Sequence, residues 1–345
     1  MNDKKENIRK LRKKIIRIGF IGAGSIGSLF GGYLASLKSD IYSSEVLLIC
    51  RKDHAEAINK NGLILQKTDF NLEIRNIKAF NNSAEVEDYI IKDVLDFIFL
   101  SVKTYDIETA MLQYKNLINE SKWLVILQNG IGNEDIIRKF CSDHKIIRIV
   151  TSNGALLEKP GYVIHTGEGY TKIGFPFLNT IKQDEKEFKK AQADLRILTD
   201  LLTSAGLNTT IVEDIIQESW EKIFVNVGIN PFGALTRLTN GKLLENEGIK
   251  ILMSEAVKEA IEVAKKKNIK LSEKNFVELT YDVAEKTSNN KNSMLQDILK
   301  GKKTEIDFMN GRILKYAKDL NLKTPINELL TSLVKGLEQS FNYSS

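Results

Sequence analysis

The sequence predicts an α/β N-terminal domain with a parallel sheet, followed by an all-α C-terminal domain. Short apolar segments alternate with helical segments over roughly the first 200 residues, which is typical of a parallel sheet covered by helices. Strand patterns stop after about Val212, and the rest, to about Leu337, has helical spacing interrupted only by Pro231 and Pro325. A chain of 345 residues favours two domains. We expect a basic tail at 1–14, a first domain at 15–212 and a second at 213–345.

The expected elements of the first domain follow from short runs and their spacing. Residues 25–37 have helical apolar spacing, and 182–204 form a charged helix. The glycine-rich region 161–176 alternates in polarity, which predicts a hairpin at the sheet edge. Five apolar runs are expected to be strands: 15–21, 45–50, 95–102, 123–127 and 145–150.

Composition excludes several classes of protein. The apolar fraction of 42% and the charged fraction of 28% are those of an ordinary globular protein. No apolar run is long enough to span a bilayer, and the N-terminus has no apolar core of a secretory signal. The two cysteines, Cys50 and Cys141, form no C-x-x-C pair, so we expect neither disulfides nor structural zinc. A cytoplasmic location fits best.

The net charge of +5 resides in the first 14 residues. Because the rest of the chain is balanced, no basic surface patch and no nucleic-acid partner are expected. The tail is interpreted as a solvated extension, with a weak RNA contact or a targeting role as alternatives. Its charged residues are Asp3, Glu6, Lys4, Lys5, Arg9, Lys10, Arg12, Lys13 and Lys14.

A glycine-rich turn follows the first predicted strand and opens the first helix. Its sequence, G-x-G-x-x-G, allows a tight turn, a close approach of pyrophosphate to the backbone, and close packing of helix on strand. The free N–H groups of the helix end then face the phosphates. The alternative is a glycine-rich turn without a ligand. The pattern predicts a Rossmann-type dinucleotide site at Gly22, Ala23, Gly24, Ser25, Ile26 and Gly27.

Arg51 follows the second predicted strand, where an NAD site usually has Asp or Glu. An arginine there can form charge-assisted hydrogen bonds with a 2′-phosphate, so NADP(H) is favoured. A solvated arginine is the alternative. The long connection 39–45 could also displace Arg51 from the expected place.

Lys222, Asn226 and Asn230 share one helical stripe at four-residue spacing, and their neighbours are largely apolar. Buried polar groups need partners, which a ligand could supply. The alternative is a lysine that extends to solvent and two amides that cap loops. Pro231 is expected to kink or end the helix there.

Six motifs in order make the chain resemble the ketopantoate reductase family over nearly all of its length after residue 14. The last three are the most specific. The motifs are GAGSIG at 22–27, SVK at 101–103, QNGIG at 128–132, EKIFVNVGINP at 221–231, NSMLQD at 292–297 and TEIDFMNG at 304–311. The resemblance implies a cleft between the two domains in which NADPH reduces 2-dehydropantoate (ketopantoate) to pantoate, a precursor of pantothenate and coenzyme A.

The resemblance also implies the roles of individual residues. Hydride addition to a 2-oxo acid turns the carbonyl oxygen into an alkoxide, which needs a cation and a proton donor. Lys222 would be the general acid, since a partly desolvated lysine gives up its proton readily. Glu305 would lie at the reacting centre, orienting Lys222 or the nicotinamide ribose. Lys103 and Asn129 would lie beside the nicotinamide. The substrate would be bound by Asn226, Asn230, Asn240 and Ser293.

Some alternatives stay open. Another 2-oxo acid or opine-type reductase could use the same scaffold, because fold does not determine substrate. A redox sensor that binds NADPH without turnover would be expected to lack Lys222. A homodimer is suggested only by the helical second domain. His54, His144 and His165 lack metal-ligand spacing, and His54 is interpreted as an exposed loop residue. Trp123 and Trp220 are expected in the core.

Overall fold

The computed structural model describes residues 13–67, 70–90 and 94–341, so most of the expected tail lies outside the described residues. Contacts divide the chain into two units. Unit 1 comprises residues up to Val102, Ala110–Leu127 and Cys141–Val212. Unit 2 comprises Lys103–Thr109, Gln128–Phe140 and the chain from Glu213. Two short segments from the first half of the sequence therefore belong with the C-terminal helices.

Unit 1 is built on an eight-stranded sheet with the order β12-β11-β8-β7-β6-β1-β2-β5. The strands from β8 to β5 run parallel, and β11 runs antiparallel to β8. All five strands expected from apolar runs are present in this sheet. Their bounds are β1 (Lys14–Ile21), β2 (Tyr42–Ile49), β5 (Ile77–Phe80), β6 (Phe97–Leu100), β7 (Trp123–Ile126), β8 (Ile146–Thr151), β11 (Thr171–Gly174) and β12 (Thr209–Ile211).

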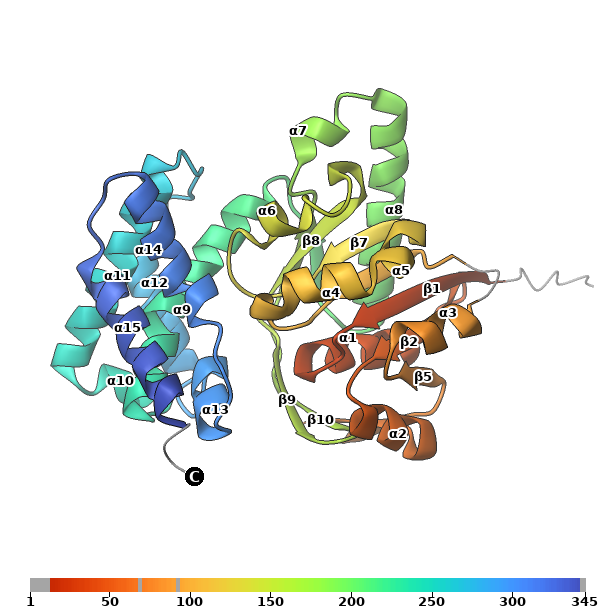
Figure 1. Ribbon diagram of the computed structural model, residues 1–345, viewed down its shortest axis with the longest axis horizontal. Helices are drawn as coiled ribbons and strands as arrows, with labels where there is room; N and C mark the ends of the chain where they lie inside the picture. Colours follow the sequence, from red (N-terminus) through yellow and green to blue (C-terminus); the bar gives the residue numbers. More distant parts are fainter. Residues whose placement is uncertain (1–12, 68–69, 91–93, 342–345) are drawn as a thin grey trace, which may run out of the picture. The chain divides into compact units, whose positions relative to one another are not determined.

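Helices pack on this sheet because its strands are apolar on both faces, as in other parallel sheets. All four residues of β6 and of β7 are buried. In Figure 1, α1 and α8 lie on the opposite side of the sheet from α4 and α5. The helices of unit 1 are α1 (Ser25–Ala35), α2 (Lys52–Asn61), α3 (Ser83–Tyr89), α4 (Ile107–Gln113), α5 (Lys115–Glu120), α7 (Leu178–Ile181) and α8 (Glu185–Ser204); the first residues of α4 fall in unit 2.

Unit 1 contains a second sheet that the sequence did not predict, and the expected hairpin at the edge of the large sheet is not formed. Its four strands have the order β4-β3-β10-β9, with bounds β3 (Leu63–Gln66), β4 (Asn71–Ile74), β9 (Gly154–Lys159) and β10 (Tyr162–Gly167). The region 161–176 is split: β10 pairs with β9 in this small sheet, while β11 joins the large sheet. Alternation alone does not reveal a strand's partner, so the predicted pairing was wrong.

Unit 2 is largely helical, as expected for the region after Val212. Trp220 lies in its buried core and Trp123 in that of unit 1, which confirms both predictions. The helices are α6 (Asn133–Ile137), α9 (Ile215–Thr236), α10 (Asn240–Leu244), α11 (Glu247–Lys266), α12 (Phe276–Lys286), α13 (Ser293–Leu299), α14 (Asn310–Asp319) and α15 (Pro325–Ser340), with short 3-10 turns at Thr104–Asp106 and Ile306–Phe308.

The two prolines behave differently. Pro325 is the first residue of α15, where a missing N–H costs nothing. Pro231 lies inside α9, which continues to Thr236, so the helix does not end there. The carbonyl of Val227, four residues before Pro231, accepts a hydrogen bond from the Asn310 amide at 3.3 Å instead. A side chain thus replaces the bond that proline cannot donate.

Candidate functional site

The glycine turn after β1 has the geometry that a dinucleotide site requires. Gly22 has φ +80°, and a Cβ there would collide with Val102. A Cβ at Gly27 would collide with the Ser101 side chain. A Cβ at Gly24 would meet nothing closer than 3.9 Å, so its outer side is open to an approaching group. Two glycines therefore serve packing, and the third leaves room for pyrophosphate.

The end of α1 beside this turn lacks a side-chain cap and has no acidic residue in its first turn. The positive end of the helix is therefore available to an anion. Ser25 Oγ accepts a hydrogen bond from the Leu157 N–H at 3.0 Å, which leaves its own O–H free to donate. Ala23 is buried, and its N–H donates to the Ile49 carbonyl at 2.9 Å. Ile26 packs against the core.

Arg51 is exposed and stands two residues after the end of β2, immediately before α2. The long connection before β2 does not displace it, because the added residues lie before the strand or extend its amino end. Tyr42 pairs with Lys14 and Ile49 pairs with Ile21 without an irregularity. Arg51 is therefore at the strand end where the sequence placed it.

Lys103, Asp297 and Glu305 form one charged cluster in unit 2. Lys103 Nζ lies 2.7 Å from Asp297 Oδ2 and 3.4 Å from Glu305 Oε2. Glu305 Oε1 accepts hydrogen bonds from the Thr104 N–H at 3.0 Å and the Thr104 hydroxyl at 3.1 Å. Only 7% of Glu305 is exposed, so it is a buried carboxylate.

Lys103 keeps its charge in this cluster through attraction to the two carboxylates. Burial alone would lower the pKa of Lys103, but attraction to Glu305 and then to Asp297 raises it above its usual value. Burial raises the pKa of Asp297, an effect that Lys103 opposes. Lys103 is therefore a firmly protonated cation.

Lys222 and Asn129 form the second polar pair of unit 2. Lys222 Nζ donates to Asn129 Oδ1 at 2.6 Å. Asn129 lies in the loop after β7, and its carbonyl accepts from the Asn133 side chain at 2.8 Å. That loop packs tightly on the segment that follows Glu305, because a Cβ on Gly130 would collide with the Phe308 carbonyl. Local packing thus determines where Asn129 holds the lysine.

The predicted substrate-binding residues also lie in unit 2. Asn226 is half-buried on α9, one turn after Lys222. Asn230 is buried and donates to Met309 Sδ at 3.6 Å, a weak acceptor. Asn240 is buried and donates to the Thr287 hydroxyl at 2.9 Å. Ser293 is exposed at the first position of α13.

Sequence reasoning missed two members of these sites, Asp297 and Thr104, and it misjudged the burial of His54. Asp297 stands in the quoted motif NSMLQD, four residues after Ser293, so its spacing was the available signal. Thr104 directly follows Lys103. His54 is buried on α2 with 3% exposed, which corrects the expectation of an exposed loop residue. Its burial could not be read from a helix as polar as α2.

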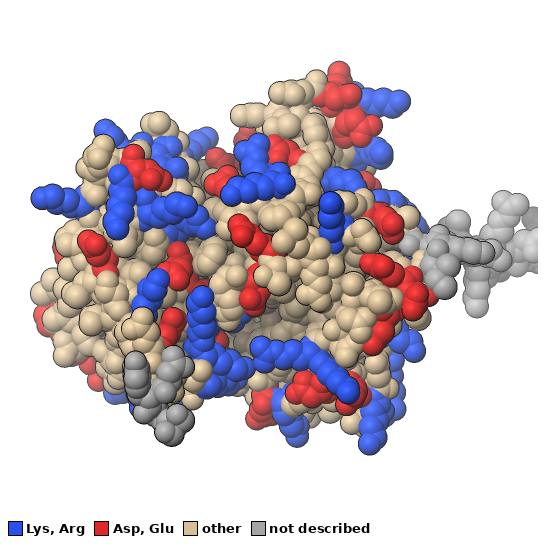
Figure 2. All heavy atoms as spheres, in the orientation of Figure 1, with Lys and Arg blue, Asp and Glu red and all other residues tan. Residues whose placement is uncertain are grey.

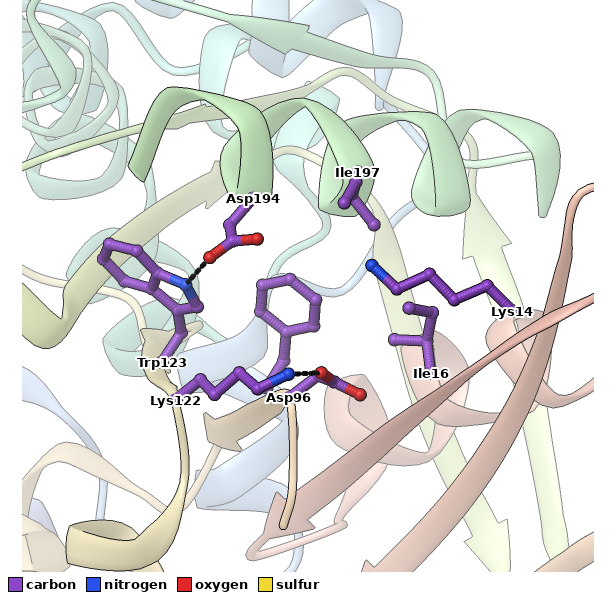
Figure 3. Close-up of a pocket in the computed structure, with 8 residues that line it drawn as sticks. Lys14, Ile16, Asp96, Lys122, Trp123, Asp194 and Ile197 are labelled. Carbon is purple, nitrogen blue, oxygen red and sulfur yellow. Dashed lines mark hydrogen bonds and ion pairs between the residues drawn. The ribbon is translucent and has the colours of Figure 1, made fainter. Parts of the chain in front are cut away.

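A small hollow in unit 1 lies away from these groups (Figure 3). It is lined by residues at the starts of β1, β6 and β7 and by α8. The Asp194 carboxylate accepts from Trp123 Nε1 at 3.0 Å, and Lys122 pairs with Asp96. Ligands of parallel sheets bind at the carboxyl ends of strands, so this hollow is not the dinucleotide site.

Charged side chains of both signs are interspersed over the face shown in Figure 2. Across residues 13–67, 70–90 and 94–341, no helix is long and apolar enough to cross a membrane. The same residues contain no group of three or more His, Cys, Asp or Glu placed to hold a metal ion.

A Rossmann-type turn on a parallel sheet, joined to a helical unit with a lysine–carboxylate cluster, defines the class of two-domain dinucleotide-dependent oxidoreductases. Two family models match the chain: ketopantoate reductase PanE/ApbA over residues 18–176 and its C-terminal domain over residues 214–338. The chain belongs to the ketopantoate reductase family and is an oxidoreductase.

Relatives cover nearly the whole chain. A 2-dehydropantoate 2-reductase of Pyrococcus abyssi is 38% identical over 94% of this chain and 98% of its own length. The Archaeoglobus fulgidus protein of the same name is 31% identical over 94% of this chain and 99% of its own length. Among solved structures, a ketopantoate reductase from Ralstonia eutropha has a TM-score of 0.80 at 26% identity. The match covers 95% of this chain and 100% of the Ralstonia chain. A D-mandelate dehydrogenase with NADH and anilino(oxo)acetate has a TM-score of 0.81 at 28% identity, with the same coverage.

Proposed function

We propose that this protein is a 2-dehydropantoate 2-reductase that reduces the ketone of ketopantoate to the hydroxyl of pantoate with NADPH. The observation that carries the proposal is the Lys222–Asn129 hydrogen bond of 2.6 Å, which gives a proton donor a defined position. The relatives in two archaea, each matched over nearly its full length, support the same reaction. The reaction belongs in the cytoplasm, where Cys50 and Cys141 stay reduced.

The cofactor assignment depends on unit 1. The open side of Gly24 and the uncapped end of α1 fit a pyrophosphate. Arg51, exposed at the end of β2, fits a 2′-phosphate, which favours NADPH over NADH. When bound, the reduced nicotinamide supplies the hydride to the ketone carbon.

Lys222 supplies the proton. As the carbonyl carbon is reduced, negative charge develops on its oxygen, and a nearby ammonium both stabilises that charge and donates the proton. Asn129 Oδ1 accepts a hydrogen bond from the Lys222 ammonium, which restrains the position of the proton donor. Asn226, Asn230, Asn240 and Ser293 provide hydrogen bonds for the substrate carboxylate and hydroxyls.

Glu305 and Lys103 prepare the nicotinamide side of the site. Glu305 is anchored by Thr104 through two hydrogen bonds, so its carboxylate is held in one orientation. Lys103 is held by two carboxylates and provides a positive charge for ribose or carboxylate oxygens.

A second candidate is the reduction of another 2-oxo acid. The D-mandelate dehydrogenase neighbour, which carries NADH and anilino(oxo)acetate, is as similar in structure as the ketopantoate reductases. A shared scaffold therefore accepts different substituents on the oxo acid and a different cofactor.

The deciding experiment follows nicotinamide absorbance with ketopantoate and NADPH, with NADH and with benzoylformate as parallel arms. Fast turnover with ketopantoate and NADPH alone supports the proposal. A preference for benzoylformate would replace it with the second candidate.

Lys222→Met tests the proton donor. We expect kcat to fall by about 10²- to 10⁴-fold, the usual contribution of a general acid, while NADPH still binds. Lys270→Met, at an exposed lysine of unit 2, is the matched control and should keep full activity. Unchanged turnover by Lys222→Met would remove this lysine from the mechanism.

A further inference from the structure

His54 is a buried histidine that the proposed chemistry does not use, and both of its ring nitrogens are engaged. Nδ1 lies 2.9 Å from the Gly161 backbone nitrogen, and Nε2 lies 3.0 Å from Ser28 Oγ. The ring thus joins three segments that are distant in sequence: α1, α2 and the turn between β9 and β10.

The direction of each hydrogen bond follows from chemistry. A backbone N–H can only donate, so Nδ1 accepts from Gly161 and carries no proton. Neutral imidazole then has its proton on Nε2, which donates to Ser28 Oγ. The Ser28 hydroxyl in turn donates to the Ala23 carbonyl at 3.1 Å. One chain of three hydrogen bonds therefore runs from the Gly161 N–H to the glycine turn.

The carbonyl at the end of this chain matters for anion binding. The Ala23 carbonyl and the Gly24 N–H belong to one planar peptide group, so restraining one orients the other. The Gly24 N–H of that peptide donates to the Gly22 carbonyl at 2.6 Å, so a flip would turn the Ala23 oxygen toward the Gly22 oxygen and change the shape of the glycine turn. The Ser28 hydrogen bond opposes that flip.

The same hairpin contacts the turn a second time. The Leu157 N–H on β9 donates to Ser25 Oγ at 3.0 Å. The β9–β10 hairpin therefore supports the phosphate-binding turn at two points, through Ser25 directly and through His54 and Ser28.

From this geometry we propose that His54 is a positioning residue for the dinucleotide: through Ser28 it holds the Ala23–Gly24 peptide, and with it the glycine turn, in the shape that a pyrophosphate can approach at Gly24. This inference rests on the proposed function only in that the turn binds a dinucleotide. It does not depend on which oxo acid is reduced.

The test measures the affinity for NADPH of His54→Leu and His54→Gln by the fluorescence of the bound nicotinamide. Both variants are first shown to unfold at the temperature of the wild-type protein or a few degrees below it. Leucine removes both hydrogen bonds, whereas glutamine can accept from Gly161 and donate to Ser28. We expect the Kd for NADPH to rise about 10-fold in His54→Leu, the effect of one or two hydrogen bonds. Glutamine should restore most of the affinity.

The kinetic pattern separates positioning from general destabilisation. The KM for ketopantoate and kcat at saturating NADPH should stay within about twofold of wild type, because the reacting groups are in unit 2. His144→Leu, at an exposed histidine, is the matched control. Ser28→Ala should weaken NADPH binding as His54→Leu does, and the double variant should be no weaker than either, because both residues act through one chain.

Three outcomes would overturn the inference: wild-type affinity in His54→Leu, additive losses in the double variant, or nitrogen NMR that finds the proton on Nδ1. The proposed function fails separately. Tight NADPH binding without ketopantoate turnover rejects ketopantoate as the substrate. The role of His54 is then still tested by the Kd for NADPH. A wild-type protein that binds no dinucleotide rejects both.

Discussion

Glu305 illustrates how a single buried carboxylate can organise its surroundings. Its two oxygens accept from Thr104 twice and attract Lys103, so none of the desolvated charge is left uncompensated. Asp297 completes the arrangement by taking the closer contact with Lys103.

Substitution of the single residue Arg51 tests the preference for NADPH over NADH. Arg51→Ala should lower the ratio of kcat/KM for NADPH over NADH by about 10- to 100-fold, because charge-assisted hydrogen bonds to the 2′-phosphate are lost. The ratio is measured from initial rates with both cofactors. Lys60→Ala, at an exposed lysine of α2, should leave it unchanged. An unchanged ratio in Arg51→Ala would assign phosphate recognition to another residue.

At the scale of elements, α9 is an unbroken helix with an internal proline because another element supplies the missing bond. Asn310, at the start of α14, donates both to the Val227 carbonyl and to Asn327 Oδ1. Asn327 donates in turn to the Ala256 carbonyl and to Glu259. A buried polar network thus ties α9, α11, α14 and α15 together at the level of the Asn226–Asn230 stripe.

Asn310→Ala should lower the free energy of unfolding by about 1–3 kcal/mol, since it leaves the Val227 carbonyl without its partner. In a Pro231→Ala background the same change should cost less, because an alanine at that position can donate the helical bond itself. Urea unfolding of the four proteins measures the difference. Equal costs in both backgrounds would show that the proline does not explain the Asn310 contact.

At the scale of the whole molecule, the two units are interleaved in sequence. The segments that carry Lys103 and Asn129 directly follow β6 and β7, yet both belong to the helical unit. The buried His54 and the half-buried His165 both belong to the sheet unit. Burial lowers the pKa of each, so both are neutral in the folded protein under conditions where the unfolded chain binds protons.

Stability should therefore fall as pH drops below about 6.5, the pKa of an unfolded histidine, toward the lower folded values. In that window the unfolded state binds more protons, and each proton taken up favours unfolding. His54→Gln should lose less stability than wild type between about pH 7.5 and pH 5.5, measured by urea midpoints. His144→Gln should follow wild type. An equal loss in His54→Gln would mean that His54 does not contribute.

Below about pH 5.5, the dependence of folding stability on pH has a different source. Burial would raise the pKa of Glu221, but hydrogen bonds from Lys274, Gln217 and Ser272 lower it to about 2. Its contribution is present above about pH 4.3, the value of a free glutamate, and is lost only as pH falls toward 2. The histidine effect near neutral pH is therefore separate from this carboxylate.

Local patterns determined much of the architecture. Apolar runs identified the five central strands of the large sheet, and the change of spacing after Val212 identified the helical C-terminal half. Gly22, Gly24 and Gly27 were recognised from a six-residue motif, although the side chains that would collide with Gly22 and Gly27 belong to the distant residues Val102 and Ser101. Apolar runs and helical spacing depend on neighbours in the chain, so the sequence expresses them directly.

Tertiary structure alone decided which distant groups meet. Only folding brings Lys103 to Asp297 and Glu305, or His54 to Ser28 and Gly161, across many residues of chain. It also paired β10 with β9 in a second sheet, while β11 joined the large sheet, and let α9 continue past Pro231. The physical reason is that strand partners and buried hydrogen bonds are chosen by competition among all surfaces of the folded chain, which no local pattern records.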